Sequence, residues 1–383
     1  MVNNKSLKTL YIISFLLSIQ YAFTAYINST YLDRFMGDRA VGLVFTVAAT
    51  LAVLGLLKMP ELLNKIGNYR TFLWLTILSI AGLFGLIVSK NTYLIILLFL
   101  IYLIFNYLSI FSRDIFIEDY SDIKSMGKIR GLFLTIINLG WIFAPILAAI
   151  TVRSFGYQGI YMLAAIAYLP ILFIFFRRFH KFKDPVYKKI SVRETIKKIW
   201  ADKDIFRIYT SNLLLQFFYA WMVIYTPIYL NAHLGFSWSQ IGIIFMIMLL
   251  PFVLIQFVLG RLSDRIGQKK MLYIGFTIMI LSTAALSFIG PSSIWVWGIA
   301  LFITRVGAAI VEVMTETYFF KKVHVNDTDT ISFFRNTAPI SYIFAPVLAS
   351  IFFLFAPFNY IFLALSFILL FGLRLTSKIK DTI

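Results

Sequence analysis

The chain has 383 residues, of which 60% are hydrophobic and 14% are charged, and its mean hydropathy is +0.86. Soluble domains are roughly half apolar and about a quarter charged, so this composition excludes an ordinary soluble domain and indicates a protein that lies in lipid. The formal net charge is +18. Because the sequence contains no soluble basic domain to carry that charge, we expect no nucleic-acid partner.

Apolar runs of about 17 to 25 residues are long enough to cross a hydrocarbon core of about 30 Å as helices, which satisfy their own backbone hydrogen bonds. Twelve such runs are predicted, with six in each half of the chain. They cover residues 8–28, 40–57, 71–89, 92–112, 131–152, 158–176, 206–230, 238–259, 270–289, 293–315, 332–355 and 358–374. The predicted fold class is an all-α membrane protein with twelve transmembrane helices in two pseudo-symmetric six-helix bundles.

The two halves of the chain repeat one another. The stretch Ile-Phe-Ala-Pro-Ile-Leu-Ala-Ala-Ile at 142–150 returns as Ile-Phe-Ala-Pro-Val-Leu-Ala-Ser-Ile at 343–351, and residues 41–45 match residues 241–245. The offset stays near 200 over the whole half, so the two copies share one element order. The predicted domains are an N-terminal six-helix bundle at 1–176, a cytoplasmic linker at 177–205 and a C-terminal six-helix bundle at 206–383.

Lysine and arginine residues predict the orientation, because short loops rich in them stay in the cytoplasm. With a cytoplasmic N-terminus, nearly all of the 35 Lys and Arg residues fall inside, and only Arg34, Arg39, Lys90 and Arg153 fall outside. We therefore predict a multi-pass protein of the plasma membrane (the inner membrane of the cell) with both termini cytoplasmic. The first apolar run has full length and no small-residue cleavage site follows it, so we expect it to remain as the first span.

The linker contains a predicted amphipathic helix at 191–202. Ser191 and Glu194 have capping-box spacing at its start. A helix lying on the inner leaflet and a solvated tether both agree with this pattern.

Several chemistries have no basis in the sequence. Cysteine is absent, which excludes disulfides and thiol chemistry. The histidines His180, His233 and His324 lie in three separate predicted loops without ligand spacing, so we expect no metal site. No phosphate-binding Gly-x-x-x-x-Gly-Lys-Ser/Thr loop occurs. We therefore predict a protein that is not an enzyme, needs no cofactor and takes energy for any transport from gradients or from a partner.

A gating motif follows predicted span eight. Residues 260–270 read Gly-Arg-Leu-Ser-Asp-Arg-Ile-Gly-Gln-Lys-Lys and resemble the signature loop of the major facilitator superfamily, Gly-x-Leu-x-Asp-Arg-x-Gly-Arg-Lys-Lys. The family places this loop between spans two and three of each half. The first half carries a weaker copy at 60–70, where Asn64 replaces the acid. The candidate gating residues are Gly260, Asp264, Arg265, Gly267, Lys269 and Lys270 in the second half, with Asn64, Lys65 and Gly67 in the first.

The resemblance covers the whole chain and implies a role for this loop. In the family, the loop latches one half to the other on the cytoplasmic side when the transporter faces outward. The resemblance implies that Asp264 latches near the start of span five, around Arg130 and Gly131. A carboxylate is attracted to a helix N-terminus, and glycine allows close approach of helices. Because Asn64 replaces the acid, the resemblance does not establish a symmetric latch onto span eleven.

Residues 140–149 also resemble a softened form of the Gly-x-x-x-Gly-Pro-x-x-Gly-Gly pattern of drug/proton antiporters in this superfamily, with alanine in place of three glycines. Small residues let helices pack closely and proline bends a helix, so packing alone explains the pattern. Because Pro346 repeats Pro145, we predict that both are symmetric gating hinges.

Charges inside a bilayer are costly and mark functional sites. Arg305, Glu312 and Glu316 lie at i, i+7 and i+11 in predicted span ten and form one stripe. If the span begins near Ser293, Arg305 lies about 18 Å down, near mid-membrane, and Glu312 lies near the inner boundary. These three residues are the candidate coupling residues, and a fixed Arg–Glu brace is the alternative.

Polar and aromatic residues of spans one, four, five, seven and ten are candidates for lining a substrate cavity. They are Gln20, Tyr21, Thr24, Asn106, Asn138, Asn212, Gln216, Tyr219, Trp221 and Arg305. Bonding between neighbouring helices is the alternative role for each of the amides and tyrosines.

The sequence thus predicts a secondary transporter that moves a small organic solute by alternating access, coupled to protons, with substrate bound near the midplane. The predicted partners are a small-molecule substrate, protons and the lipid bilayer, and the predicted state is a monomer. A non-transporting membrane sensor or lipid-handling protein of the same fold is the alternative. A channel is less favoured, because the halves lack a repeated charged ring or carbonyl filter.

Overall fold

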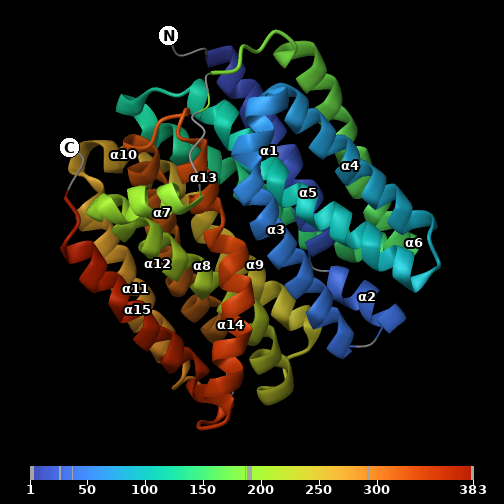
Figure 1. Ribbon diagram of the computed structural model, residues 1–383. Coiled ribbons are helices and arrows are strands. Elements are labelled where there is room, and N and C mark those ends of the chain that lie inside the picture. Colours follow the sequence, from blue (N-terminus) through green and yellow to red (C-terminus); the bar gives the residue numbers. More distant parts are fainter. Residues whose placement is uncertain are drawn as a thin grey trace. The chain divides into compact units, whose positions relative to one another are not determined.

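The computed structural model describes residues 4–25, 27–36, 38–185, 187, 192–290 and 293–380. These residues form helices joined by short connections, and no strand occurs among them (Figure 1). The predicted all-α class is therefore confirmed. Eleven helices in the described part are long and apolar enough to cross a membrane. The predicted span at 131–152 is not among these eleven, although it is helical.

The helices pack as two compact units, and each takes in a short segment that the sequence halves would assign to the other. Unit 1 combines the chain up to Ser121 with Ile136–Val192 and His324–Pro339. Unit 2 combines Asp122–Thr135, Arg193–Val323 and the chain from Ile340 onward. The predicted boundaries of the bundles and linker follow the sequence repeat and stay a prediction.

Unit 1 holds the helices of the first half and one short helix of the second. Its helices are α1 (Asn4–Ala25), α2 (Asn28–Met36), α3 (Asp38–Ile66), α4 (Asn68–Val88), α5 (Thr92–Asp119), most of α6 (Met126–Phe179) and α13 (Thr328–Arg335). Helix α4 packs along α5, and α13 packs against α3 and α5. Asn91 begins α5 by accepting a hydrogen bond from the backbone N–H of Leu94 (3.1 Å), which satisfies one free donor of the first turn.

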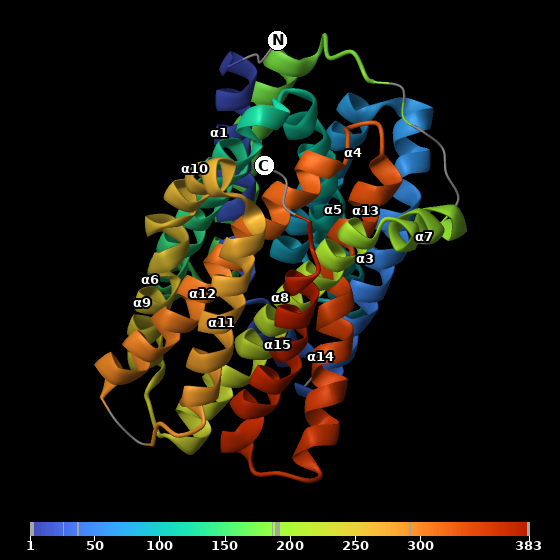
Figure 2. The same cartoon turned by 90° about the vertical axis from the view of Figure 1, so that its left-hand side faces the viewer.

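Unit 2 holds the helices of the second half and the start of α6. Its elements are η1 (Ile123–Ser125), α7 (Val192–Ala201), α8 (Lys203–Ile228), η2 (Tyr229–His233), α9 (Trp238–Leu254), α10 (Gln256–Ile266), α11 (Gln268–Leu286), α12 (Ile294–Lys322), α14 (Thr337–Phe353), η3 (Phe358–Tyr360) and α15 (Ile361–Ser377). Helix α11 packs against both α12 and α15 (Figure 2). Ser237 and Gln240 form a capping box at the start of α9, and Ser293 caps α12.

Observed helices differ from the predicted spans mainly at their ends. Helix α6 contains predicted spans five and six, with a break at Gly156 (φ 68°, ψ −168°). Predicted span eight becomes α9 and α10, and predicted span eleven becomes α13 and α14. Helix α2 lies where the sequence predicted a loop. Helices α5 and α12 continue past the predicted apolar runs, and the added residues include Arg113 and Asp114 of α5 and Glu316 of α12, which form ion pairs.

The linker helix is present as α7, but Ser191 lies outside the described residues. Asp202 caps the next helix, α8, by accepting hydrogen bonds from the backbone N–H groups of Asp204 and Ile205.

The repeat is visible in the backbone. Gly67 (φ 78°, ψ 160°) separates α3 from α4, and Gly267 (φ 81°, ψ 165°) separates α10 from α11. The two glycines are 200 positions apart and share a positive φ angle, which residues other than glycine rarely adopt.

Candidate functional site

The gating motif of the second half lies at the end of α10, where Asp264 caps the first turn of α6. Its carboxylate accepts hydrogen bonds from the backbone nitrogens of Gly127 (3.1 Å) and Lys128 (2.9 Å). The first N–H groups of a helix have no partner within the helix and carry partial positive charge. A carboxylate accepts hydrogen bonds from these N–H groups, and its negative charge is attracted to the positive end of the helix. The contact lies about one turn before Arg130, the position that the family resemblance implied.

Glycines let α6 and α10 approach closely at this point. A Cβ atom at Gly131 would lie 2.7 Å from the backbone oxygen of Gln256, and one at Gly127 or Gly260 would overlap the backbone oxygen of the other residue. Real side chains do not tolerate such distances, so any larger residue would push the two helices apart.

Two ion pairs connect the end of α12 to the same region. Lys321 Nζ lies 3.2 Å from Asp264 Oδ1, and Arg130 Nη1 lies 3.7 Å from Glu316 Oε2. Arg130 is fully buried, and its guanidinium lies 3.3 Å from the ring centroid of Phe320. A buried charge is tolerated only with a partner, so Arg130 and Glu316 depend on each other.

The other residues of this motif take different positions. Gly267 forms the turn described above, Arg265 is exposed, and Lys269 and Lys270 line a groove between α11 and α15. Within the described residues, none of these side chains forms a hydrogen bond or ion pair with the start of α6, so Asp264 provides the cap.

In the first half, the sequence-predicted residues form only local contacts. Asn64 donates to the backbone oxygen of Pro60 in its own helix, and Lys65 pairs with Glu61 (3.1 Å). The acid at this turn comes instead from the linker, since Asp184 accepts a hydrogen bond from the backbone N–H of Asn68. Sequence analysis missed Asp184, because nothing in the motif spacing points to a residue 116 positions away.

Asp184 also receives the hydroxyl of Tyr187, at 2.6 Å. Burial of this tyrosine, followed by its hydrogen bond to Asp184 and the negative charges of Asp184 and Asp119, raises the pKa of Tyr187. The hydrogen bond from Tyr187 to Asp184 joins two linker residues at the start of α4.

A counterpart of the Arg130–Glu316 pair occurs in unit 1. Arg335, at the end of α13, forms an ion pair with Asp114 of α5, which also lies 3.8 Å from Arg113. One turn earlier in α13, the Ser332 hydroxyl donates to the backbone oxygen of Leu56 in α3. The start of predicted span eleven thus packs against first-half helices, although position 64 carries asparagine in place of the acid of the motif. The repeat offset could have suggested this pairing, since Asp114 and Glu316 are 202 positions apart.

Three of the predicted cavity residues in unit 1 form a buried polar network. Gln20 donates to Asn106 Oδ1 (2.8 Å), and Tyr102 links Gln20 (3.1 Å) to Thr24 (2.7 Å). The Tyr168 hydroxyl reaches the same Asn106 oxygen at 3.4 Å. Within the described residues, Asn106 Nδ2 is buried without a hydrogen-bond partner. Buried polar atoms of this kind require an explanation such as a bound ligand or water.

Tyr21 and Asn138 are the other two predicted cavity residues of unit 1. The ring of Tyr21 packs edge-on against Trp141, with centroids 5.7 Å apart. Asn138 is half-buried in α6.

The predicted cavity residues of unit 2 gather on α8 and α12. Arg305 is 3% exposed, and its guanidinium lies 4.8 Å from the ring centroid of Phe218 and 5.7 Å from that of Tyr219. Such cation–π contacts stabilise a desolvated arginine. The Tyr219 hydroxyl and Trp221 Nε1 are further buried polar atoms that find no hydrogen-bond partner in the described part of the chain.

Asn212 and Gln216 complete this group on α8. Asn212 Oδ1 accepts from the Thr315 hydroxyl at 3.5 Å, and Gln216 is half-buried.

The three candidate coupling residues of α12 face three different helices. Arg305 faces α8, Glu312 accepts a hydrogen bond from Gln256 Nε2 of α10, and Glu316 pairs with Arg130 of α6. Glu312 therefore touches the helix that carries Gly260 and Asp264.

The two predicted hinge prolines lie inside helices. Pro346 is half-buried within α14. The backbone at Pro145 is helical, but its side chain lies outside the described part of the structure. Near it, a Cβ atom at Gly140 would lie 3.0 Å from the backbone nitrogen of Ile19 in α1, so this glycine serves helix packing. A hinge role stays a prediction for both prolines.

Comparisons of the sequence and of the structure with known proteins agree on the fold. Residues 10–338 match the sequence profile described as Major Facilitator Superfamily. The structure is similar to that of the human organic anion transporter MFSD10 (TETRAN), with a TM-score of 0.81, 13% identity and coverage of 97% of this chain and 99% of that chain. It is also similar to a bacterial homologue of the iron transporter ferroportin in an outward-facing state, with a TM-score of 0.79, 12% identity and coverage of 97% and 98%. A search of curated protein sequences gives no match.

Proposed function

Because the chain belongs to the Major Facilitator Superfamily, a family of multi-pass membrane transporters, we propose that it is a secondary active transporter that moves a small organic solute by alternating access. The observation that carries the proposal is the contact between Asp264 and the first turn of α6. Helix α6 begins in unit 2 and continues into unit 1. A cap that forms in one state and breaks in another would therefore act on both units.

The Asp264 cap and the two arginine–acid pairs are proposed to work as latches. Arg130–Glu316 holds the first-half segment in unit 2, and Arg335–Asp114 holds the second-half segment in unit 1. Breaking these ion pairs leaves the buried charges without partners, which is unfavourable unless water can reach them. Opening on the predicted cytoplasmic side would hydrate them and lower that penalty.

Glu312 is the proposed coupling residue. When charged, it accepts a charge-assisted hydrogen bond from Gln256, a class worth about 1.5–3 kcal/mol, against about 0.5–1.5 for a neutral bond. Protonation would weaken the hold of α12 on α10 and so favour release of the Asp264 cap. Glu316 is instead proposed to belong to the Arg130–Glu316 latch, because it forms an ion pair with Arg130.

Arg305 is the proposed contact for the substrate in unit 2, together with the buried Tyr219 hydroxyl and Trp221 Nε1, which have no hydrogen-bond partner in the described part of the chain. A buried arginine beside aromatic rings favours a solute with a carboxylate or phosphate group and an apolar or aromatic body. The human fold relative is an organic anion transporter, but at 13% identity it supports the fold alone.

We further propose that the protein is a monomer in the plasma membrane, with both termini in the cytoplasm, and that protons supply the energy. The distribution of Lys and Arg residues supports the orientation.

Counterflow in proteoliposomes tests the proposal independently of the energy source. Vesicles loaded with an unlabelled compound take up its labelled form only if the protein alternates between two states with substrate bound. A panel of organic anions, sugars, peptides and amphipathic cations should contain compounds that exchange with the wild type and fail with Arg305→Ala. If no compound exchanges and none raises the melting temperature, the protein is a sensor or lipid-handling member of the fold.

A further inference from the structure

The two lysines at the end of the gating motif line a groove on the surface of unit 2. The groove has a volume of about 400 Å³ and lies between the start of α11 and the end of α15. It is lined by Lys269, Lys270, Tyr273, Ile274, Thr376 and Ser377. Half of the Tyr273 surface is exposed, as is 43% of Ile274. The groove therefore has cationic and hydroxyl groups at one end and apolar side chains below them.

The positive charge at this end of the groove is not neutralised within the described residues. Neither Lys269 nor Lys270 forms an ion pair there, and the same holds for Arg374 and Lys378 near the end of α15. The nearest acid in the sequence, Asp264, is already paired with Lys321. Arg374 lies about one turn before Ser377 on α15, and Lys378 directly follows Ser377 at the end of the helix. An anionic group would meet several uncompensated cations.

An exposed apolar seam continues from the charged end along both helices. On α11, Ile274 is followed by Leu281, which is 67% exposed, and on α15 the exposed fractions are 48% for Phe371 and 75% for Phe367. Both helices are long and apolar enough to cross the membrane, and they pack against each other. The groove therefore opens where a charged headgroup zone would meet hydrocarbon.

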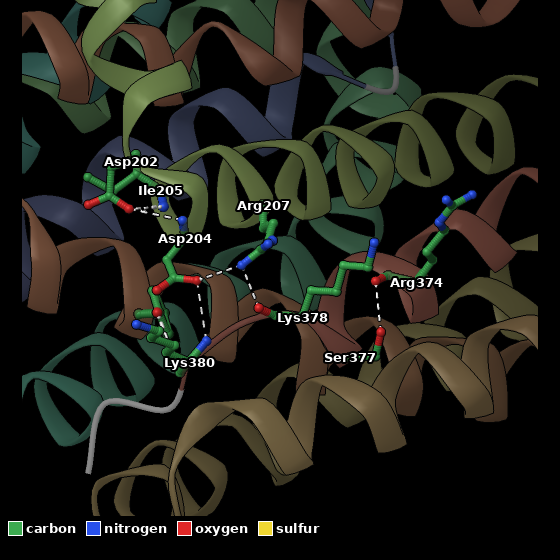
Figure 3. Close-up of polar contacts among 9 residues, drawn as sticks. Asp202, Asp204, Ile205, Arg207, Arg374, Ser377, Lys378 and Lys380 are labelled. Carbon is green, nitrogen blue, oxygen red and sulfur yellow. Dashed lines mark hydrogen bonds and ion pairs between the residues drawn. The ribbon is translucent and has the colours of Figure 1, made fainter.

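The α15 wall of the groove is fixed by the C-terminal segment. Arg207 donates to the backbone oxygen of Lys378, and the backbone N–H of Lys380 donates to Asp204 (3.3 Å) (Figure 3). Tyr318 of α12 donates to the backbone oxygen of Lys380 (2.7 Å), and Ile379 is 1% exposed. These contacts hold the end of α15 to α8 and α12, so the groove needs little ordering before it binds a ligand.

We propose that this groove binds the headgroup of an anionic phospholipid. Lys269 and Lys270 bind the phosphate, and an acyl chain follows the seam below Tyr273 and Ile274. Basic pockets between transmembrane helices on the cytoplasmic side are suited to such headgroups. The proposal explains why the motif carries two lysines that the cap at Asp264 does not use, and it does not depend on transport.

Native mass spectrometry of the purified protein tests the proposal by titration with dioleoyl phosphatidylglycerol and, separately, dioleoyl phosphatidylcholine. We expect the first tight adduct with phosphatidylglycerol only. Each lysine near a headgroup contributes about fivefold in affinity, so Lys269→Gln/Lys270→Gln should weaken that adduct about 25-fold. The matched control is Lys5→Gln/Lys8→Gln, which removes two exposed lysines at the start of α1 on the same predicted side. An equal loss in the control, or equal binding of phosphatidylcholine, would overturn the proposal.

A competition experiment separates a lipid site from a site for free phosphate. Glycerol 1-phosphate shares the headgroup chemistry but has no acyl chain, so we expect it to displace phosphatidylglycerol only at more than 100-fold higher concentration. Tyr273→Ala should weaken lipid binding several-fold while both lysines remain, and its elution and melting temperature show whether it folds. Displacement by glycerol 1-phosphate at equal concentration, or unchanged lipid binding in Tyr273→Ala, would exclude a lipid as the ligand.

Discussion

Asp264 Oδ2 lies 2.9 Å from the backbone nitrogen of Lys128, although 136 residues separate the two in the sequence. This hydrogen bond joins a carboxylate of the second half to a helix N-terminus of the first. Its strength depends on the formal charge of Asp264, because the helix end carries partial positive charge and Lys321 lies 3.2 Å away.

Removing the charge of Asp264 should impair transport more than any change at Asn64. Asparagine keeps only one acceptor oxygen, so Asp264→Asn removes one of the two hydrogen bonds from the backbone N–H groups of Gly127 and Lys128. It also removes the attraction of the charge to the helix dipole and to Lys321. A loss of about 1–2 kcal/mol corresponds to a factor of about 5–30 in the latch equilibrium, and counterflow should slow accordingly. Asp264→Ala, which also removes the cap, should be worse.

Asn64→Ala is the control for this comparison, since Asn64 bonds only the backbone of its own helix. It should keep nearly full counterflow. Equal rates in Asp264→Asn and Asn64→Ala would show that the second-half cap has no special role.

Gly131→Ala tests the close approach of α6 and α10. The new methyl group would meet the backbone oxygen of Gln256 at 2.7 Å, and overpacking of this kind costs about 1–3 kcal/mol. We expect a lower melting temperature and slower counterflow. Gly242→Ala is the matched control, because Gly242 is also helical and nothing lies within 4 Å of a Cβ atom there. A similar change in both variants would show that glycine at 131 is not required for packing.

The Arg130–Glu316 pair should behave as a unit in a double-mutant cycle. Arg130 is 0% exposed and Glu316 is 4% exposed, so removing either partner leaves a buried charge and costs about 3–5 kcal/mol. Arg130→Met/Glu316→Leu leaves no charge and should lose much less than the sum of Arg130→Met and Glu316→Leu. Denaturation monitored by tryptophan fluorescence gives the coupling energy. Additive losses would mean that the two side chains act separately.

The orientation can be tested with single cysteines, because the chain has none of its own. Lys90 and Gly290 lie in loops predicted to be outside, and Lys181 and Lys270 lie on the side predicted to be inside. Lys90, Lys181 and Lys270 are exposed, and nothing lies within 4 Å of a Cβ atom at Gly290. An impermeant maleimide added to intact cells should label cysteine at 90 and 290, and label 181 and 270 only after lysis. The reverse pattern would invert the predicted topology.

Much of the fold follows from local sequence properties. Apolar length predicts where helices lie, because a membrane helix satisfies its own backbone hydrogen bonds. The repeat predicts equivalent turns, and Gly67 and Gly267 have nearly the same conformation. Helix ends were less predictable, since Arg113 and Asp114 extend α5 through an ion pair that depends on Arg335, over 200 residues away.

The site was predictable only where a motif carries it. The motif pointed to Asp264 and to the region of its partner within about one turn. Asp184 was not predictable, because it depends on a tertiary contact between segments with no sequence signature. The Arg335–Asp114 pair could have been suggested only by the repeat offset, from the position of Glu316. Gln20, Thr24 and Asn106 were identified as polar residues in apolar runs. Only the structure shows that Gln20 bonds Asn106 directly and is linked to Thr24 by Tyr102.

The most direct test of the account is substrate accumulation driven by a pH gradient in proteoliposomes, with Glu312→Gln beside the wild type. Glutamine keeps the size of Glu312 and can still bond Gln256 but cannot carry a proton. The wild type should accumulate substrate against its gradient and lose accumulation when a proton ionophore is added. Glu312→Gln should retain counterflow and fail to accumulate. Accumulation by Glu312→Gln at the wild-type level would contradict proton coupling through this residue.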